Sequence, residues 1–211
     1  MKTLRARSIS LAVLPILDGP EREGLALGHG YVDLGDEVIV LTPLGAPRMP
    51  NGIETEVALA RGVRCTIGGG RLVTRDTSVL EGPHWDPVPR PRVRLWTKGA
   101  TAPDPRALAG RGEGLTPAGD DVLAGYAAGL LLFHGRSREA QAIAEEAAPL
   151  TTALSATLLR HAARGALPEP AHALLEDGDA RPLLSFGHTS GRALLFGLAL
   201  GAAARAADDA S

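Results

Sequence analysis

The sequence predicts an α+β protein in which a β-rich first half packs on a helical second half. Residues 1–111 hold 11 of the 16 prolines and short runs of Val, Ile and Leu, whereas residues 112–211 are rich in Ala and Leu. The first half carries 15 basic and 12 acidic residues, and the second carries 7 and 12. We place the boundary between 111 and 112. The two halves are expected to form one compact unit, with the strands in a meander or small barrel.

Six segments of the first half are expected to be strands because they are short, aliphatic and bounded by glycine or proline. They are Ser8–Leu14, Gly30–Leu34, Glu37–Leu41, Val63–Ile67, Arg71–Thr74 and Arg92–Trp96. The glycines at 35 and 68–70 predict hairpin turns, since glycine readily adopts the positive φ that such turns need. A short helix is expected over Glu54–Ala60.

Five segments of the second half show helical spacing or strong helical propensity. They are Pro117–Phe133, Ser137–Ala148, Pro149–Arg164, Glu169–Glu176 and Ser190–Ala207. Two of them share a glycine pattern, because Gly119, Gly125 and Gly129 recur 72 residues later as Gly191, Gly197 and Gly201. Glycine costs a helix interior about 1 kcal/mol relative to alanine. We therefore expect these two helices to cross at the glycines, which would bring their N-terminal loops to a shared site.

Composition excludes several classes of protein. A net charge of −2 argues against nucleic-acid binding. The single cysteine, Cys65, rules out an internal disulfide and fits a reducing cytoplasm. The longest apolar stretches, 122–133 and 193–204, are shorter than the ~18 residues needed to span a bilayer, so no membrane association is expected.

The first candidate site is the loop that precedes the first glycine-patterned helix. Gly114 lets the backbone approach a ligand, Thr116 and Pro117 are typical of a helix start, and Gly119 follows. A helix N-terminus binds anions, yet Asp120 and Asp121 in the first turn would repel one unless a metal, an arginine or an amine lies between. The alternative is a capped helix with acidic first-turn residues.

The second candidate site is the loop that precedes the other glycine-patterned helix. It holds His188, Thr189, Ser190 and Gly191, and histidine is a residue type that can protonate or deprotonate a substrate. If the loops converge, Asp120, Asp121 and His188 would form an acid–base cluster or a site for Mg²⁺, Mn²⁺ or Zn²⁺. A structural histidine is the alternative. Thr151, Thr152 and Ser155 at a third helix start would bind an anion or cap that helix.

These motifs resemble a family of bacterial proteins that includes AllH, a subunit of oxamate carbamoyltransferase. The resemblance rests on Gly-Leu-Thr-Pro-Ala-Gly-Asp-Asp at 114–121, Thr-Thr at 151–152 with Ser-Ala-Thr-Leu-Leu-Arg at 155–160, and Gly-His-Thr-Ser-Gly at 187–191. Trp-Asp-Pro at 85–87 is also similar to the family. The resemblance implies a cytoplasmic subunit that acts with other carbamoyltransferase subunits. Its reaction would be carbamoyl transfer between oxalurate or oxamate and phosphate or carbamoyl phosphate, in allantoin and purine-nitrogen catabolism.

The candidate residues can be matched to that chemistry. The loop with Gly114, Thr116 and Gly119 would hold phosphate, and Thr189, Ser190 and Gly191 would serve an oxyanion or carboxylate. His188 would move the proton, Asp120 or Asp121 would hold the carbamoyl NH₂ or Mg²⁺, and Arg192 would pair with a carboxylate. Two alternatives stay open: a non-catalytic assembly or metabolite-sensing subunit, and a metal-dependent hydrolase. The glycine-patterned helices would also serve an interface in a homo-oligomer.

Overall fold

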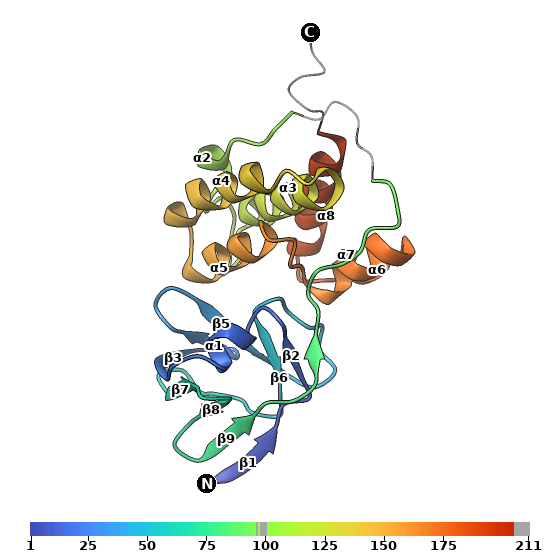
Figure 1. The fold of residues 1–211 in the computed structure, drawn as a ribbon. Coiled ribbons are helices and arrows are strands. Elements are labelled where there is room, and N and C mark those ends of the chain that lie inside the picture. The colour runs from blue at the N-terminus through green and yellow to red at the C-terminus, as the bar shows by residue number, and fades with distance from the viewer. Residues whose placement is uncertain (96, 98–100, 205–211) are drawn as a thin grey trace. The chain divides into compact units, whose positions relative to one another are not determined.

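The computed structural model describes residues 1–95, 97 and 101–204, which form two compact units, Met1–Pro87 and Val88–Ser211 (Figure 1). The division falls before the composition change at 111. Segment 88–95 belongs with the helices because the Arg92 N–H donates to the Leu175 carbonyl at 2.8 Å and the Arg90 N–H to the Glu176 carboxylate at 2.9 Å. The structure thus confirms the α+β class with strands first and helices second.

Within the described residues, the first unit contains one sheet of ten strands in the order β1-β9-β8-β7-β3-β4-β5-β6-β2-β10. The strands are β1 Lys2–Arg5, β2 Ser8–Ser10, β3 Arg22–Gly28, β4 Tyr31–Asp33, β5 Val38–Thr42, β6 Gly52–Glu54, β7 Arg64–Gly68, β8 Arg71–Val73, β9 Thr77–Leu80 and β10 His84–Trp85. The short helix α1, Leu14–Leu17, follows β2. Antiparallel meanders join β3, β4 and β5, and likewise β7, β8 and β9.

The sheet curls because two chain segments contribute strands to both of its ends. One segment holds β1 and β2, the other holds β9 and β10, and the two bend together and run side by side. β1 pairs with β9 in parallel, and further along the same segments β2 pairs with β10 in parallel. Gly82 lies at the bend, where the backbone of Ala6 leaves no room for a side chain. Ile9, Ile39, Ile53, Ile67 and Leu72 fill the enclosed core.

Four of the predicted strands match β4, β5, β7 and β8, and both predicted hairpin turns are present. Ser8–Leu14 is a strand only to Ser10. The helix expected over Glu54–Ala60 is wrong, because the Thr55 N–H continues the sheet by donating to the Thr42 carbonyl at 2.9 Å. The strand expected at Arg92–Trp96 is absent over 92–95, and Trp96 lies outside the described residues.

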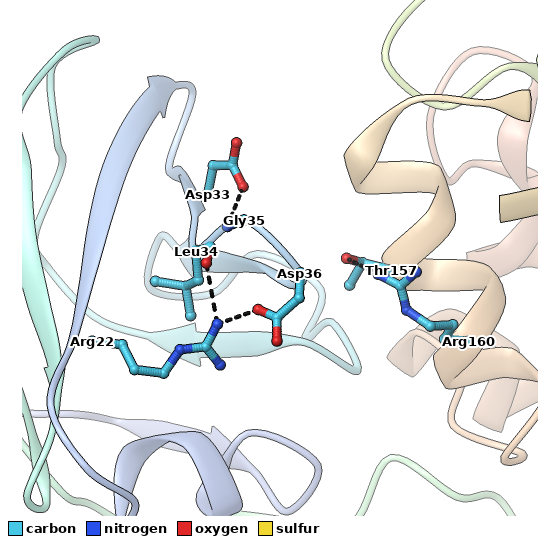
Figure 2. Close-up of polar contacts among 7 residues, drawn as sticks. All are labelled: Arg22, Asp33, Leu34, Gly35, Asp36, Thr157 and Arg160. Atoms are coloured by element: carbon cyan, nitrogen blue, oxygen red, sulfur yellow. Dashed lines mark hydrogen bonds and ion pairs between the residues drawn. The ribbon is translucent and has the colours of Figure 1, made fainter. Parts of the chain in front are cut away.

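Polar contacts fix the turn between β4 and β5 (Figure 2). The Asp33 carboxylate accepts the Gly35 N–H at 2.8 Å, and the Arg22 guanidinium bonds both the Leu34 carbonyl, at 3.1 Å, and the Asp36 carboxylate. Gly35 has a φ of +94°, so a residue with a side chain would be strained there. The predicted role of glycine in this hairpin is therefore confirmed.

The second unit is helical, with the 3₁₀ turn η1 at Ala148–Leu150. Its helices are α2 Pro105–Leu108, α3 Ala118–His134, α4 Ser137–Ala147, α5 Ala153–Ala162, α6 Glu169–Asp177, α7 Arg181–Leu184 and α8 Ser190–Ala203. Predicted helices match α3, α4, α6 and α8, although residues 205–207 of the last lie outside the described residues. The helix expected over Pro149–Arg164 is interrupted, because Thr152 caps α5 through its hydroxyl, which accepts the Ser155 N–H at 3.1 Å.

The expected crossing of the two glycine-patterned helices is confirmed. A Cβ added to Gly125 would lie 3.0 Å from the Cα of Gly197, and one added to Gly129 would lie 2.9 Å from the Cα of Gly201. Backbone thus packs directly on backbone, and a methyl group at these positions would force the helices apart. Leu123, Leu198 and alanines from α3, α4 and α5 complete the core around this contact.

Candidate functional site

The loops before α3 and α8 repeat one hydrogen-bonding pattern, which explains the first glycine of each helix. In both loops, a turn residue donates its N–H to a leucine carbonyl three residues earlier and accepts the N–H of the helix glycine. A Cβ on either glycine would collide with that leucine carbonyl. The residues are Leu108, Arg111 and Gly119 before α3, and Leu183, Phe186 and Gly191 before α8. The N–H groups of Gly119 and Gly191 are therefore already used inside the fold, at 2.9 Å each.

Alternate glycines shape the first loop. Gly110, Gly112 and Gly114 have φ values of +70°, +124° and +88°. Gly110 also lies against the Leu150 carbonyl, whereas Gly114 has open space where a side chain would project. Gly110 and Gly112 are thus required by packing, because backbone atoms lie where a side chain would project. Gly114 is required by its backbone conformation alone.

Asp120 connects three segments of the helical unit. It is buried, with 3% of its surface exposed. One carboxylate oxygen accepts the Gly110 N–H at 2.8 Å, and the other accepts the Thr151 hydroxyl. Both oxygens thus have donors from the protein itself. The arrangement holds the glycine loop and the start of α5 against α3.

The start of α5 holds the same loop from the other side. The Leu115 carbonyl accepts the Thr152 hydroxyl at 2.8 Å and the Ser155 hydroxyl at 3.4 Å. Ser155 is almost fully buried. The capping role of Thr152 is confirmed, and these hydroxyls shape the loop through its own backbone.

Asp121 differs from its neighbour. Its Oδ2 atom is buried and has no hydrogen-bond partner among the described residues. Burial raises the pKa of this carboxyl from 3.8 to about 7, an effect opposed by a hydrogen bond from the Ser190 hydroxyl and reinforced by the Asp120 charge. The Asp121 carboxyl can therefore give or take a proton near neutral pH.

The two loops meet at their hydroxyls. Thr116 Oγ1 lies 3.3 Å from Ser190 Oγ, which confirms that the helix starts of α3 and α8 converge. Thr116 does not cap α3: the helix begins at Ala118 after Pro117 and has no side-chain cap. Ser190 therefore links the two loops: its hydroxyl bonds the Asp121 carboxyl and lies within hydrogen-bond distance of the Thr116 hydroxyl.

His188, Thr189 and Arg192 are exposed at the start of α8. The structure shows neither a hydrogen bond nor an ion pair for the side chains of His188 and Arg192 within the described part of the chain. No three His, Cys, Asp or Glu side chains gather as a metal site in that same part. Asp120, Asp121 and His188 therefore do not gather as a metal site among these residues. Both carboxylate oxygens of Asp120 accept hydrogen bonds from the protein itself.

Fold and site together define an α+β protein. In its helical unit, α3 and α8 cross at their glycines, and the polar loops that precede these two helices converge. Residues 108–202 match the family described as "Oxamate carbamoyltransferase subunit AllH". The matched segment runs from the end of α2 to α8 and contains both loops. The resemblance inferred from the motifs is confirmed over this range.

The remaining comparisons add no relative. Neither the comparison with curated proteins nor that with solved structures gives a match. Among the helices that the structure describes, none combines the length and apolar character needed to cross a membrane.

Proposed function

We propose that this chain is a subunit of a carbamoyltransferase of the oxamate type and that its small anionic substrate binds where the α3 and α8 loops converge. The observation that carries the proposal is the Asp121 carboxyl bonded by the Ser190 hydroxyl, which in turn lies 3.3 Å from the Thr116 hydroxyl, inside the segment that matches the AllH family. Carbamoyl transfer needs a group that exchanges a proton near neutral pH and donors for a developing oxyanion. A carboxyl with a pKa of about 7 and adjacent hydroxyls supply these elements.

In the direction of oxalurate synthesis, the amide nitrogen of oxamate attacks the carbamoyl carbon of carbamoyl phosphate. A C–N bond forms, the C–O bond to phosphate breaks, and the proton lost from nitrogen ends on the departing phosphate. Asp121 in its ionised form accepts that proton and passes it to phosphate. The Thr116 hydroxyl donates to the carbamoyl oxygen as it gains negative charge, while Ser190 keeps its hydrogen bond to Asp121.

The exposed residues at the start of α8 supply binding. Arg192, whose guanidinium has no ion pair within the described residues, offers paired donors to a carboxylate or phosphate. His188 and Thr189 add further donors beside it. The proposal assigns Asp120, Thr151, Thr152 and Ser155 a positioning role, since their side chains bond the chain itself.

A non-catalytic role as an assembly or sensing subunit has one observation in its favour. The Gly119 and Gly191 N–H groups, which an anion at a helix start would need, donate to carbonyls of their own loops. On this alternative, the loops bind a metabolite or a partner without reacting.

The test measures oxalurate formed from carbamoyl phosphate and oxamate by the full chain, alone and with its co-expressed partner subunits. We expect Asp121→Asn to lower the transfer rate at least tenfold, a typical contribution of one acid–base group being ~10²–10⁴. His188→Ala and Arg192→Ala should raise the apparent KM. Asp177→Asn, an exposed carboxylate of the same unit, is the matched control. Unchanged transfer in Asp121→Asn would favour the non-catalytic role.

Binding is tested separately by thermal unfolding with phosphate, carbamoyl phosphate, oxamate or oxalurate. A ligand at about 100 times its Kd adds ~2.7 kcal/mol to the free energy of unfolding, which is about 5–10 °C for a chain of this length. The shift should disappear in Arg192→Ala. A shift that survives this change would place the anion elsewhere.

A further inference from the structure

The free edge of β1 is the feature of the first unit that the carbamoyl-transfer site does not use. β1 is an end strand of the sheet and pairs only with β9 within the described residues. The Lys2 N–H donates to the Asp76 carbonyl at 2.7 Å and the Ala6 N–H to the Leu80 carbonyl at 3.0 Å. Since backbone groups alternate in direction along a strand, those of Thr3 and Arg5 face the opposite edge, where the described residues form no strand.

A cavity of about 790 Å³ lies along this edge. It opens where the segment before β2 and the segment after β6 diverge. The Arg7 N–H makes the last bond between them, to the Glu54 carbonyl at 2.8 Å, and the next residue, Thr55, bonds β5 instead. Leu4, Arg5 and Arg7 line one side, and Leu44, Glu54 and Glu56 line the other. The cavity therefore has an unpaired strand edge as one wall.

Most of the charged side chains on the cavity walls make no ion pair within the residues that the structure describes. Arg5 is the last residue of β1 and Arg7 lies in the bend that follows it; both side chains are exposed, and both residues line the cavity. Neither they nor Glu56 make an ion pair within the described residues. Glu54 accepts the Gly45 N–H at 3.1 Å. Opposite charges thus stand on opposite walls with the cavity between them.

We propose that this cavity receives an extended peptide segment of a partner subunit, which adds to β1 as a further strand. Main-chain bonds to Thr3 and Arg5 would supply affinity, as in other cases of strand addition. Two acidic side chains spaced two residues apart would face Arg5 and Arg7, and a basic side chain would face Glu56. A second copy of β1 is a poor occupant, because its own Lys2, Arg5 and Arg7 would meet like charges.

The first experiment selects binders to the full chain from a phage-displayed library of random dodecapeptides. We expect enriched peptides to carry two acidic residues at alternate positions. Their affinity, measured by fluorescence polarisation, should fall about tenfold or more in the Arg5→Glu/Arg7→Glu variant, because two attractive charge pairs become repulsive. Arg75→Glu, another exposed arginine of the unit, is the matched control and should bind normally. No enrichment, or equal loss in both variants, would overturn the proposal.

The second experiment distinguishes strand addition from simple charge attraction. Amide hydrogen exchange followed by NMR should show new protection at Thr3 and Arg5 when a selected peptide binds. Lys2 and Ala6, which already donate to β9 and its flanks, should change little. Binding that leaves the Thr3 and Arg5 amides unprotected would refute strand addition. An enriched peptide N-methylated at alternate residues should lose affinity if the proposal is correct.

Discussion

Replacing Asp121 by asparagine changes stability in a way that depends on pH and can be calculated from the structure. Burial raises the pKa of this carboxyl to about 7 in the folded chain, against 3.8 when it is exposed. A raised folded pKa means that the stability gained with the neutral form is present at low pH and is lost as pH rises through the folded pKa. Asparagine stays neutral, so the variant avoids this loss.

The size of the effect follows from the two pKa values. Each pH unit between them lowers the free energy of unfolding of the wild type by about 1.4 kcal/mol. Between pH 5 and pH 7 the advantage of Asp121→Asn should therefore grow by roughly 2–3 kcal/mol, and above pH 8 it should stay constant.

The assay is urea unfolding at several pH values between 5 and 9, followed by circular dichroism at 222 nm, which reports on the helical unit. At each pH we compare the free energy of unfolding of the variant with that of the wild type, because the contributions of the other carboxylates cancel in the difference. Asp177→Asn serves as the control and should show no such trend. If the Asp121→Asn difference is independent of pH, the carboxyl is not neutral in the folded chain and its assignment to proton transfer fails.

Three further predictions concern packing and burial. Gly125→Ala should lower the free energy of unfolding by about 1–3 kcal/mol in thermal or urea unfolding, because the methyl group would meet the Leu194 carbonyl; stabilisation would show that the helices separate easily. Thr151→Val should cost about 1.5–3 kcal/mol, since it leaves one oxygen of buried Asp120 without its donor, and a cost below 0.5 kcal/mol would contradict that bond. The thiol of Cys65 is buried, and burial raises its pKa, so a thiol reagent at pH 8 should react only after denaturation; rapid reaction in the folded chain would contradict its burial.

Local pattern predicted most helices and turns correctly because their causes are local. Gly35 and Gly68–Gly70 supply turn conformations that the backbone requires, and α3 and α8 begin close to the predicted residues. The strands that were missed have non-local causes. β1 exists because it pairs in parallel with β9, some 75 residues away in sequence, although the alternation of apolar and basic residues from Leu4 to Arg7, across the end of the strand, was a usable signal.

The segment after β6 shows how tertiary pairing overrides propensity. Glu54–Ala60 has residues that suit a helix, but the Thr55 N–H is taken by β5. The interruption between η1 and α5 has a tertiary cause beside the local cap of α5 by Thr152, since the Thr151 and Thr152 hydroxyls donate to Asp120 and to the Leu115 carbonyl. In both places the bond partner lies in another element.

The sequence alone determined the α+β class, the spacing of the glycines and the residue types at both loops, because each depends on neighbours along the chain. It also implied that the glycines at 125 and 197 would face a close partner. Only the tertiary structure decided which of the two adjacent carboxyls would have its pKa raised by burial. Asp120 and Asp121 are adjacent and chemically alike, yet Gly110 and Thr151 reach the first, whereas burial without a second donor leaves the other with a pKa near 7. Protonation depends on surroundings assembled from distant segments, and these surroundings exist only in the folded chain.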